Sequence, residues 1–182
     1  MIYLFLADGF EEAEALVTID ILRRAEIEVE TVSVEGKAVK GAHGIVVSAD
    51  KTAQEIDLNN NFDGVILPGG MPGTLNLEKR SVVIEALRKA DSENLIIAAI
   101  CAAPMILGKM GLLKGKKAVC YPGFEEDMLG AHVQNASVVE DMNIVTGKGP
   151  GAVFDFAFKL CDMIKGNKKT SARLKQEMQC DR

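Results

Sequence analysis

Short apolar runs that alternate with amphipathic stretches constrain the fold of this chain more than any other feature. The run IYLFL (residues 2–6) is typical of a buried strand, and apolar residues then recur at helical spacing from Ala13 to Ala25. Further strand-like segments occupy residues 27–34, 44–50, 62–70, 95–100, 116–123 and 142–151, and helical segments occupy residues 81–90, 103–113 and 152–166. We expect the strand in residues 44–50 to belong to a hairpin or excursion that begins at Gly41. Strands alternating with helices in this way predict an α/β fold whose mostly parallel sheet is covered on both faces.

The size and composition of the chain favour one globular domain over residues 1–182. Of its 182 residues 48% are hydrophobic and 26% are charged, so the chain can bury a core. The basic tail, residues 167–182, is most simply a solvated helix or strap. The net charge of −5 argues against nucleic acid as a primary partner.

The ends and the cysteines of the chain indicate a cytoplasmic protein. The first residues, MIYLFLADGFEE, lack the basic region of a signal peptide, and the longest uncharged stretch, residues 95–108, is too short to span a membrane. The four cysteines lie far apart with no CxxC pair, which predicts free thiols. The two histidines, His43 and His132, do not lie at metal-ligand spacing from a cysteine, so we expect no metal site.

Three turns follow predicted parallel strands and are the candidates for a functional site. They comprise residues 7–10, which precede three glutamates, the Pro-Gly-Gly turn at residues 68–70, and residues 101–104. In open α/β sheets ligands bind beyond the carboxyl ends of the strands. We therefore expect the three turns to open onto the same edge of the sheet.

Cys101 stands where a buried strand gives way to a helix, in the segment LIIAAICAAP. Its neighbours Ala99, Ala102 and Ala103 are small, as a nucleophile elbow requires. The positive end of the following helix dipole would favour the thiolate. The alternative is that Cys101 packs in the core as a small apolar residue, as free cysteines often do.

The backbone around Gly69 and Gly70 is the candidate for stabilising a developing negative charge. The N–H group of Gly70, together with that of Ala102, could donate hydrogen bonds to an oxyanion. The alternative is that the glycine pair only provides a tight turn with positive φ.

Three glutamates lie in the first turn of the first predicted helix. The helix dipole stabilises negative charge there, and this alone is sufficient to explain the presence of Glu11 and Glu12. Glu14 lies near the apolar stripe and is expected to point inward. An ionised carboxylate would repel a Cys101 thiolate, whereas a protonated one would donate a hydrogen bond to the sulfur, so we predict that Glu14 is protonated.

With these residues laid out, the chain resembles the ThiJ/PfpI family, in its deglycase-like branch within the class I glutamine amidotransferase-like superfamily. Four motifs carry the resemblance, in the order ADGFEEAEALVTIDILRRA, DGVILPGGMPG, AAICAAP and TGKGPGAVFDFA. It implies a flavodoxin-like three-layer α/β/α sandwich, commonly a homodimer. It also implies a reactive cysteine at Cys101, a protonated glutamate at Glu14, and an oxyanion-binding glycine at Gly70 with Ala102.

The sequence departs from some relatives where they carry a histidine. Ala102 follows Cys101 directly, where some relatives have a histidine. Tyr121 precedes Pro122, whereas in the deglycase-like branch a histidine precedes this proline. His43 and His132 could reach the site only by folding back or from a second copy. A Cys–His–Asp triad is therefore unsupported, and peptidase activity is not expected. Tyr121 is a possible wall of the site that could donate a hydrogen bond but would be a poor base.

Two classes of function remain open at this point. The resemblance implies a cysteine-dependent enzyme, without metal or organic cofactor, that acts on methylglyoxal or on early glycation adducts of thiols and amines, as a deglycase or a glyoxalase. The alternative is a non-enzymatic redox sensor or stress chaperone that uses oxidation of Cys101. A role in thiazole phosphate metabolism is less favoured, because GKGPG (residues 147–151) is too short for a phosphate-binding P-loop.

Overall fold

The structure, a computed structural model, describes residues 1–180. The strands are β1 (Ile2–Leu6), β2 (Val29–Ser33), β3 (Ala38–Lys40), β4 (Val46–Ser48), β5 (Lys51–Thr52), β6 (Gly64–Leu67), β7 (Ile96–Ile100), β8 (Lys117–Ala118), β9 (His132–Val133), β10 (Val138–Asp141) and β11 (Ile144–Gly147). The α-helices are α1 (Glu12–Arg24), α2 (Gly73–Glu78), α3 (Ser81–Ser92), α4 (Pro104–Lys109), α5 (Val153–Lys165) and α6 (Lys169–Glu177). Short 3₁₀ helices cover Glu125–Asp127 and Pro150–Ala152.

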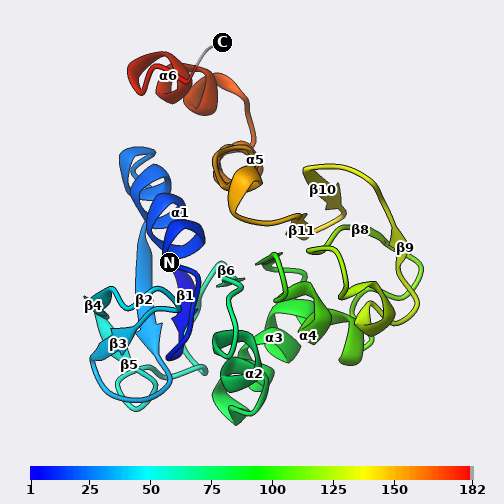
Figure 1. The fold of residues 1–182 in the computed structure, drawn as a ribbon. Coiled ribbons are helices and arrows are strands. Elements are labelled where there is room, and N and C mark those ends of the chain that lie inside the picture. Colours follow the sequence, from blue (N-terminus) through cyan, green and yellow to red (C-terminus); the bar gives the residue numbers. More distant parts are fainter. Residues whose placement is uncertain (181–182) are drawn as a thin grey trace.

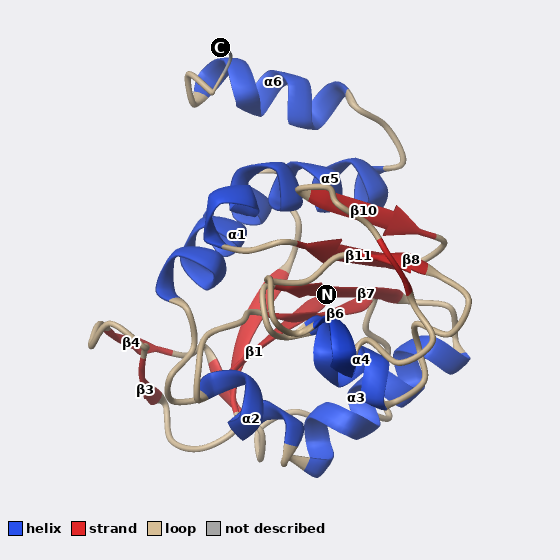
Figure 2. Cartoon of the chain, turned by 45° about the vertical axis from the view of Figure 1, so that its right-hand side comes forward, coloured by secondary structure: helices blue, strands red, loops and turns tan. Residues whose placement is uncertain are grey.

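The central sheet has seven strands in the order β10-β11-β7-β6-β1-β2-β5 (Figures 1 and 2). All neighbouring strands pair in parallel except β10 and β11, which are antiparallel. Helices α1 and α5 cover one face of the sheet, and α2, α3 and α4 cover the other (Figures 1 and 2). The predicted three-layer α/β/α fold with a mostly parallel sheet is confirmed.

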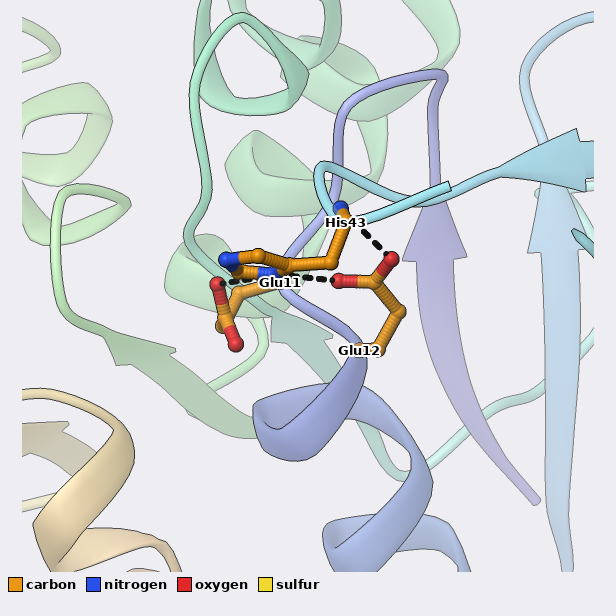
Figure 3. Close-up of side chains that lie close together, drawn as sticks. All are labelled: Glu11, Glu12 and His43. Carbon is orange, nitrogen blue, oxygen red and sulfur yellow. Dashed lines mark hydrogen bonds and ion pairs between the residues drawn. The ribbon is translucent and has the colours of Figure 1, made fainter. Parts of the chain in front are cut away.

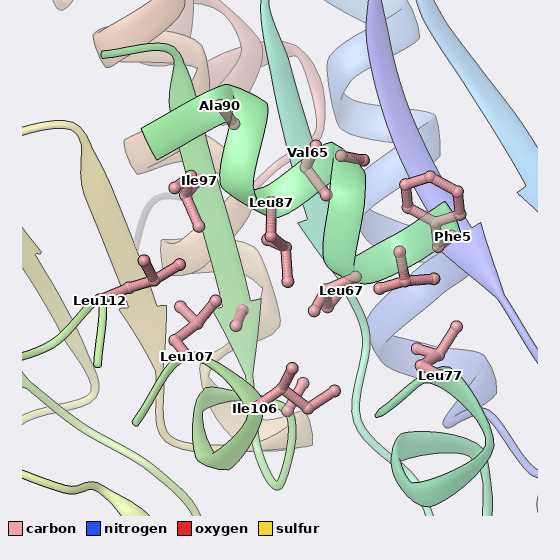
Figure 4. Close-up of a cluster of buried hydrophobic side chains, with 14 of the residues drawn as sticks. Phe5, Val65, Leu67, Leu77, Leu87, Ala90, Ile97, Ile106, Leu107 and Leu112 are labelled. Atoms are coloured by element: carbon pink, nitrogen blue, oxygen red, sulfur yellow. The ribbon is translucent and has the colours of Figure 1, made fainter. Parts of the chain in front are cut away.

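Strand β1 shows why the sheet needs helices on both faces. Its residues are all buried, and they divide by alternation between two hydrophobic clusters. Ile2, Leu4 and Leu6 pack on the side of α1 and α5. Tyr3 and Phe5 pack on the side of α3 and α4, in the cluster drawn in Figure 4. A strand that is apolar at every position therefore belongs at the centre of a doubly covered sheet.

Two short strand segments lie outside the main sheet. Residues 44–50, predicted as part of a hairpin or excursion beginning at Gly41, contain β4, which pairs with β3 in a separate hairpin that begins earlier, at Ala38. In residues 116–123 only β8 forms, and it pairs with β9. The backbone N–H groups of Lys117 and Val119 donate to the side chains of Asp141 and Thr146, at 2.7 Å and 2.9 Å, so this segment is fastened by side chains and does not join a ladder of the main sheet.

The tail is ordered as a helix over much of its length. Helix α6 packs on α5, with Leu174 buried in the same cluster as α1 and α5, so this part is more than a solvated strap. Residues 181–182, the end of the predicted tail, lie outside the described residues. Over the described residues the structure holds no helix that is both long and apolar enough to span a bilayer.

Candidate active site

Cys101 occupies a strained turn at the carboxyl end of β7. Its φ is +64°, a region that non-glycine residues seldom adopt. Two hydrogen bonds hold it there: the Cys101 N–H donates to the Gly147 carbonyl at 2.9 Å, and the Cys101 carbonyl accepts from the Tyr121 N–H at 2.8 Å. The sharp turn predicted at Cys101 is therefore confirmed in the backbone. Helix α4 begins only at Pro104, so the sulfur lies one turn before the helix and not at its first residue.

The Pro-Gly-Gly turn lies directly against this elbow. A Cβ atom on Gly69 would lie 2.6 Å from the Cβ of Cys101 and 2.8 Å from Oε2 of Glu14, so only glycine fits between them. Gly70 adopts a φ of +91°, where a Cβ would lie 2.4 Å from the Glu11 nitrogen. The three predicted turns thus meet at one edge of the sheet, as expected.

The close approach at Gly69 predicts a large effect of one added methyl group. Gly69→Ala is expected to lower the free energy of unfolding by about 2 kcal/mol, because backbone and Cys101 must both shift to relieve the overlap. Urea denaturation measures it. Gly36→Ala is the matched control, since an added Cβ there meets nothing within 4 Å. Equal stabilities of the two variants would contradict the geometry.

Glu14 points into the protein from the first turn of α1, as predicted. Its side chain is 1% exposed, and Oε2 accepts a hydrogen bond from the Gly69 N–H at 2.8 Å. Burial raises the pKa of Glu14 to about 7, outweighing the Gly69 N–H and the Cys101 thiol, which lower it. Its other oxygen, Oε1, is buried without a hydrogen-bond partner among the described residues, so a proton there is free to be donated.

The sulfur of Cys101 is coupled to this carboxyl group. As long as Glu14 is ionised, burial and then the Glu14 carboxylate raise the pKa of Cys101 to about 12, against the N–H groups of Ala102 and Gly70, which lower it. An ionised Glu14 thus keeps the sulfur as a thiol. A thiolate is compatible with the site only when the shared proton rests on Glu14.

The structure brings the predicted site residues together around one atom. The N–H groups of Ala102 and Gly70 lower the pKa of the Cys101 thiol, whereas the Glu14 carboxylate raises it. Tyr121 contacts the elbow through its backbone, while its side chain is 47% exposed. The site thus combines a thiol, a buried carboxyl group and two backbone N–H groups, which are the groups that nucleophilic catalysis requires.

A second cluster lies at the start of α1 and involves His43 (Figure 3). The Nδ1 atom of His43 lies 2.9 Å from Oε2 of Glu12 and 3.5 Å from Oε2 of Glu11. His43 therefore folds back, but onto these two carboxylates. His132 lies exposed in β9. Across residues 1–180 no hydrogen bond joins a histidine to Cys101.

Glu12 has a structural role that the helix dipole alone did not predict. It is 4% exposed, and Oε1 accepts from the N–H groups of His43 and Ile45 at 2.8 Å and 3.3 Å. Gly41 makes room for its carboxyl group, since a Cβ there would lie 2.2 Å from the carboxyl carbon. Burial would raise the pKa of Glu12, but the hydrogen bond with the His43 ring and those from the backbone N–H groups lower it. The ring hydrogen bond to Glu12, together with the charges of Glu11 and Glu12, raises the pKa of His43.

The ligand atoms of Glu11, Glu12 and His43 lie within 4.8 Å of one another, a spacing that could hold a metal ion. The Glu12 carboxylate is already satisfied by backbone donors and by His43, so we interpret the cluster as a fastening of the β3–β4 loop to α1. Glu12→Gln is expected to speed amide hydrogen exchange at His43 and Ile45, measured by NMR. Glu11→Gln is the control, because no backbone hydrogen bond to its carboxylate exists in the described chain; similar exchange in both variants would refute this role.

Comparisons with known proteins agree with this geometry. A family model described as the DJ-1/PfpI family matches residues 1–163. Protein dj-1beta of Drosophila melanogaster is 36% identical over 167 residues, covering 90% of this chain and 89% of the relative. A protein named deglycase from Pyrococcus horikoshii is 34% identical, covering 89% of this chain and 98% of the relative.

Solved structures extend the agreement to three dimensions. A cysteine-to-alanine mutant of a DJ-1 superfamily protein from Salmonella typhimurium has a TM-score of 0.92 and 40% identity, covering 97% of this chain and 96% of the other. Toxoplasma gondii DJ-1 in an oxidized form has a TM-score of 0.92 and 34% identity over the same shares. Since the family model spans most of the chain and these relatives match it nearly from end to end, the chain belongs to the DJ-1/PfpI family.

Proposed function

We propose that this protein is a cysteine-dependent enzyme acting on small reactive carbonyl compounds, such as methylglyoxal or its early adducts with thiols and amines. The observation that carries the proposal is the pairing of the buried Glu14 carboxyl with Cys101 at a strained elbow. The deglycase names of relatives such as the Pyrococcus horikoshii protein support it. Deglycase and glyoxalase chemistry would share the first step.

In that step the Cys101 thiolate adds to the aldehyde carbon of the substrate. The carbon–sulfur bond forms as the carbonyl π electrons move to the oxygen, and the N–H groups of Gly70 and Ala102 stabilise the oxyanion. Glu14 then gives its proton to that oxygen, which leaves a neutral hemithioacetal and an ionised Glu14 that can accept a proton later. The scheme uses no metal and no organic cofactor.

Turnover of methylglyoxal by the wild-type protein, with Cys101→Ser as the comparison, tests the proposal. Lactate is the expected product, measured enzymatically, and its formation should depend on Cys101. Absence of lactate from the wild-type reaction, or equal rates for both proteins, would overturn it.

A second candidate function is that of a redox sensor or stress chaperone. The partial exposure of Cys101 beside a carboxyl group that can hold a proton favours it, as does the oxidized form of the Toxoplasma gondii relative. Mass spectrometry after treatment with mild peroxide detects sulfinate at Cys101. Sulfinate formation together with an absence of carbonyl turnover would favour this function over the first.

We also propose that the protein is a cytoplasmic homodimer without nucleic acid or membrane partners. Three large apolar residues remain exposed: Leu16 of α1 (38%), Ile45 just before β4 (53%), and Val46, the first residue of β4 (60%). Apolar side chains at such exposures support a protein contact. Sedimentation of the purified chain reports its oligomeric state.

A further inference from the structure

A cavity of about 320 Å³ lies beside the elbow, between Tyr121 and the loop of residues 148–152. Cys101 itself does not line it. Two of its lining residues are nevertheless tied to the elbow. The Tyr121 N–H donates to the Cys101 carbonyl, and Lys148 follows Gly147, whose carbonyl accepts from the Cys101 N–H. The cavity therefore adjoins the backbone of the elbow that carries Cys101, and the first step does not use it.

The charge of this cavity is the opposite of that of the whole chain. The chain carries a net charge of −5, yet the lining, all within the described residues, includes Lys148 and no aspartate or glutamate. The hydroxyl groups of Tyr121 and Ser137 are further possible donors. The Lys148 ammonium donates one hydrogen bond, to Oδ1 of Asn135 at 3.2 Å, and an ammonium has three N–H donors. Lys148 also lines a second cavity, which contains Asn135 and Glu125.

The shape of the wall depends on the glycine that follows Lys148. A Cβ on Gly149 would lie 3.0 Å from the Tyr121 ring, so the loop and the ring, which both line the cavity, are in close contact. The cavity also includes Ala152, directly before the amino end of the thirteen-residue helix α5, where the helix dipole adds positive potential. Shape and potential thus both suit a small anion.

We propose that this cavity binds the anionic group, a carboxylate or a phosphate, of the carbonyl substrate, with Lys148 as the specificity-determining residue. The inference rests on the proposed function of Cys101, since it places the charged end of the substrate next to the carbonyl that the sulfur attacks. It assigns the substrate class as reactive carbonyl compounds that already carry a negative charge. A neutral compound such as methylglyoxal would leave the lysine without its partner.

The matched substrates 3-phosphooxy-2-oxopropanal and hydroxypyruvaldehyde, which differ by the phosphate, test the kinetic consequence. The wild-type protein is expected to favour the phosphorylated compound about tenfold or more in kcat/KM, because a charge-assisted hydrogen bond is lost with the phosphate. Lys148→Met should abolish this preference and Lys148→Arg should retain it. Lys51→Met, which removes a positive charge at the far edge of the sheet, is the control. An unchanged preference in Lys148→Met would overturn the proposal.

Anion binding to the Cys101→Ser protein separates failure of the subsite from failure of the enzyme. Inorganic phosphate and acetate are titrated while the amide resonances of Gly149 and Gly151 are followed by NMR. We expect saturable shifts that disappear in the Cys101→Ser/Lys148→Met double variant, and the tighter of the two anions identifies phosphate or carboxylate. Absence of saturable shifts into the tens of millimolar with either anion would refute the subsite even if methylglyoxal is turned over. Saturable binding without any turnover would refute only the proposed chemistry.

Discussion

Replacement of Cys101 by serine is expected to lower kcat/KM toward methylglyoxal by about a thousandfold or more. The hydroxyl group keeps nearly the same size and can occupy the same turn, but at neutral pH it is a far weaker nucleophile than a thiolate. The backbone hydrogen bonds that hold Cys101 to Gly147 and Tyr121 do not involve its side chain, so the fold should be retained. Lactate release, measured alongside circular dichroism, reports activity and folding separately.

Cys180→Ser is the matched control, because Cys180 is also a partly exposed free thiol but lies at the far end of the chain. It should retain wild-type activity. Cys120 and Cys161 are buried and would confound the comparison through stability. Residual activity in Cys101→Ser within a few-fold of the wild-type value would show that the sulfur is not the nucleophile.

The second large effect concerns stability and its dependence on pH. The unfolded chain releases the Glu14 proton near the ordinary pKa of 4.5, whereas the folded protein holds it up to about 7. Between these values the native state binds more protons than the unfolded state. This contribution to stability is complete below about pH 4.5 and is lost as pH rises through 7, by about 3 kcal/mol in total.

Glu14→Gln should remove this dependence, because an amide of the same shape does not titrate. Urea denaturation at about pH 5 and about pH 8 measures it, and the decrease in unfolding free energy between them should be smaller in Glu14→Gln by about 2 to 3 kcal/mol. Glu126→Gln removes the same charge from an exposed position and serves as the control. The same pH dependence in Glu14→Gln and wild type would mean that Glu14 is ionised in the fold throughout this range.

The parts of the fold that could be predicted are those where burial alone dictates the residue pattern. Strand β1 is apolar at every position, and α5 alternates apolar and polar residues at helical spacing, so both were predictable. Residues 116–123, predicted as a strand and turn, form only the short strand β8, because Asp141 and Thr146 accept hydrogen bonds from the backbone N–H groups of Lys117 and Val119. The sequence pattern of residues 116–123 alone does not distinguish this arrangement from a strand of the main sheet.

The candidate site was predictable to the extent that it follows from strand ends. The rule that parallel strands end at one edge placed Cys101, Glu14 and Gly70 together, and the structure agrees. The role of Glu12 was missed because its partners belong to residues 43–45, distant in the chain and without a motif. Lys148 was also missed, although it lies in the motif TGKGPG, because its relation to Cys101 arises only from the pairing of β7 with β11.

The central claim is that near neutral pH Glu14 holds the proton that Cys101 has lost. The most direct measurement is the ultraviolet absorbance of the thiolate against pH, with Cys101→Ser as the blank and Glu14→Leu as the variant that lacks the donor. The claim predicts a Cys101-dependent thiolate at neutral pH that titrates well below the free-thiol pKa of about 8.5, and a shift to higher pH in Glu14→Leu. A thiolate that appears only above about 8.5 in the wild-type protein would contradict it, and would place the negative charge on Glu14 and a buried thiol at Cys101.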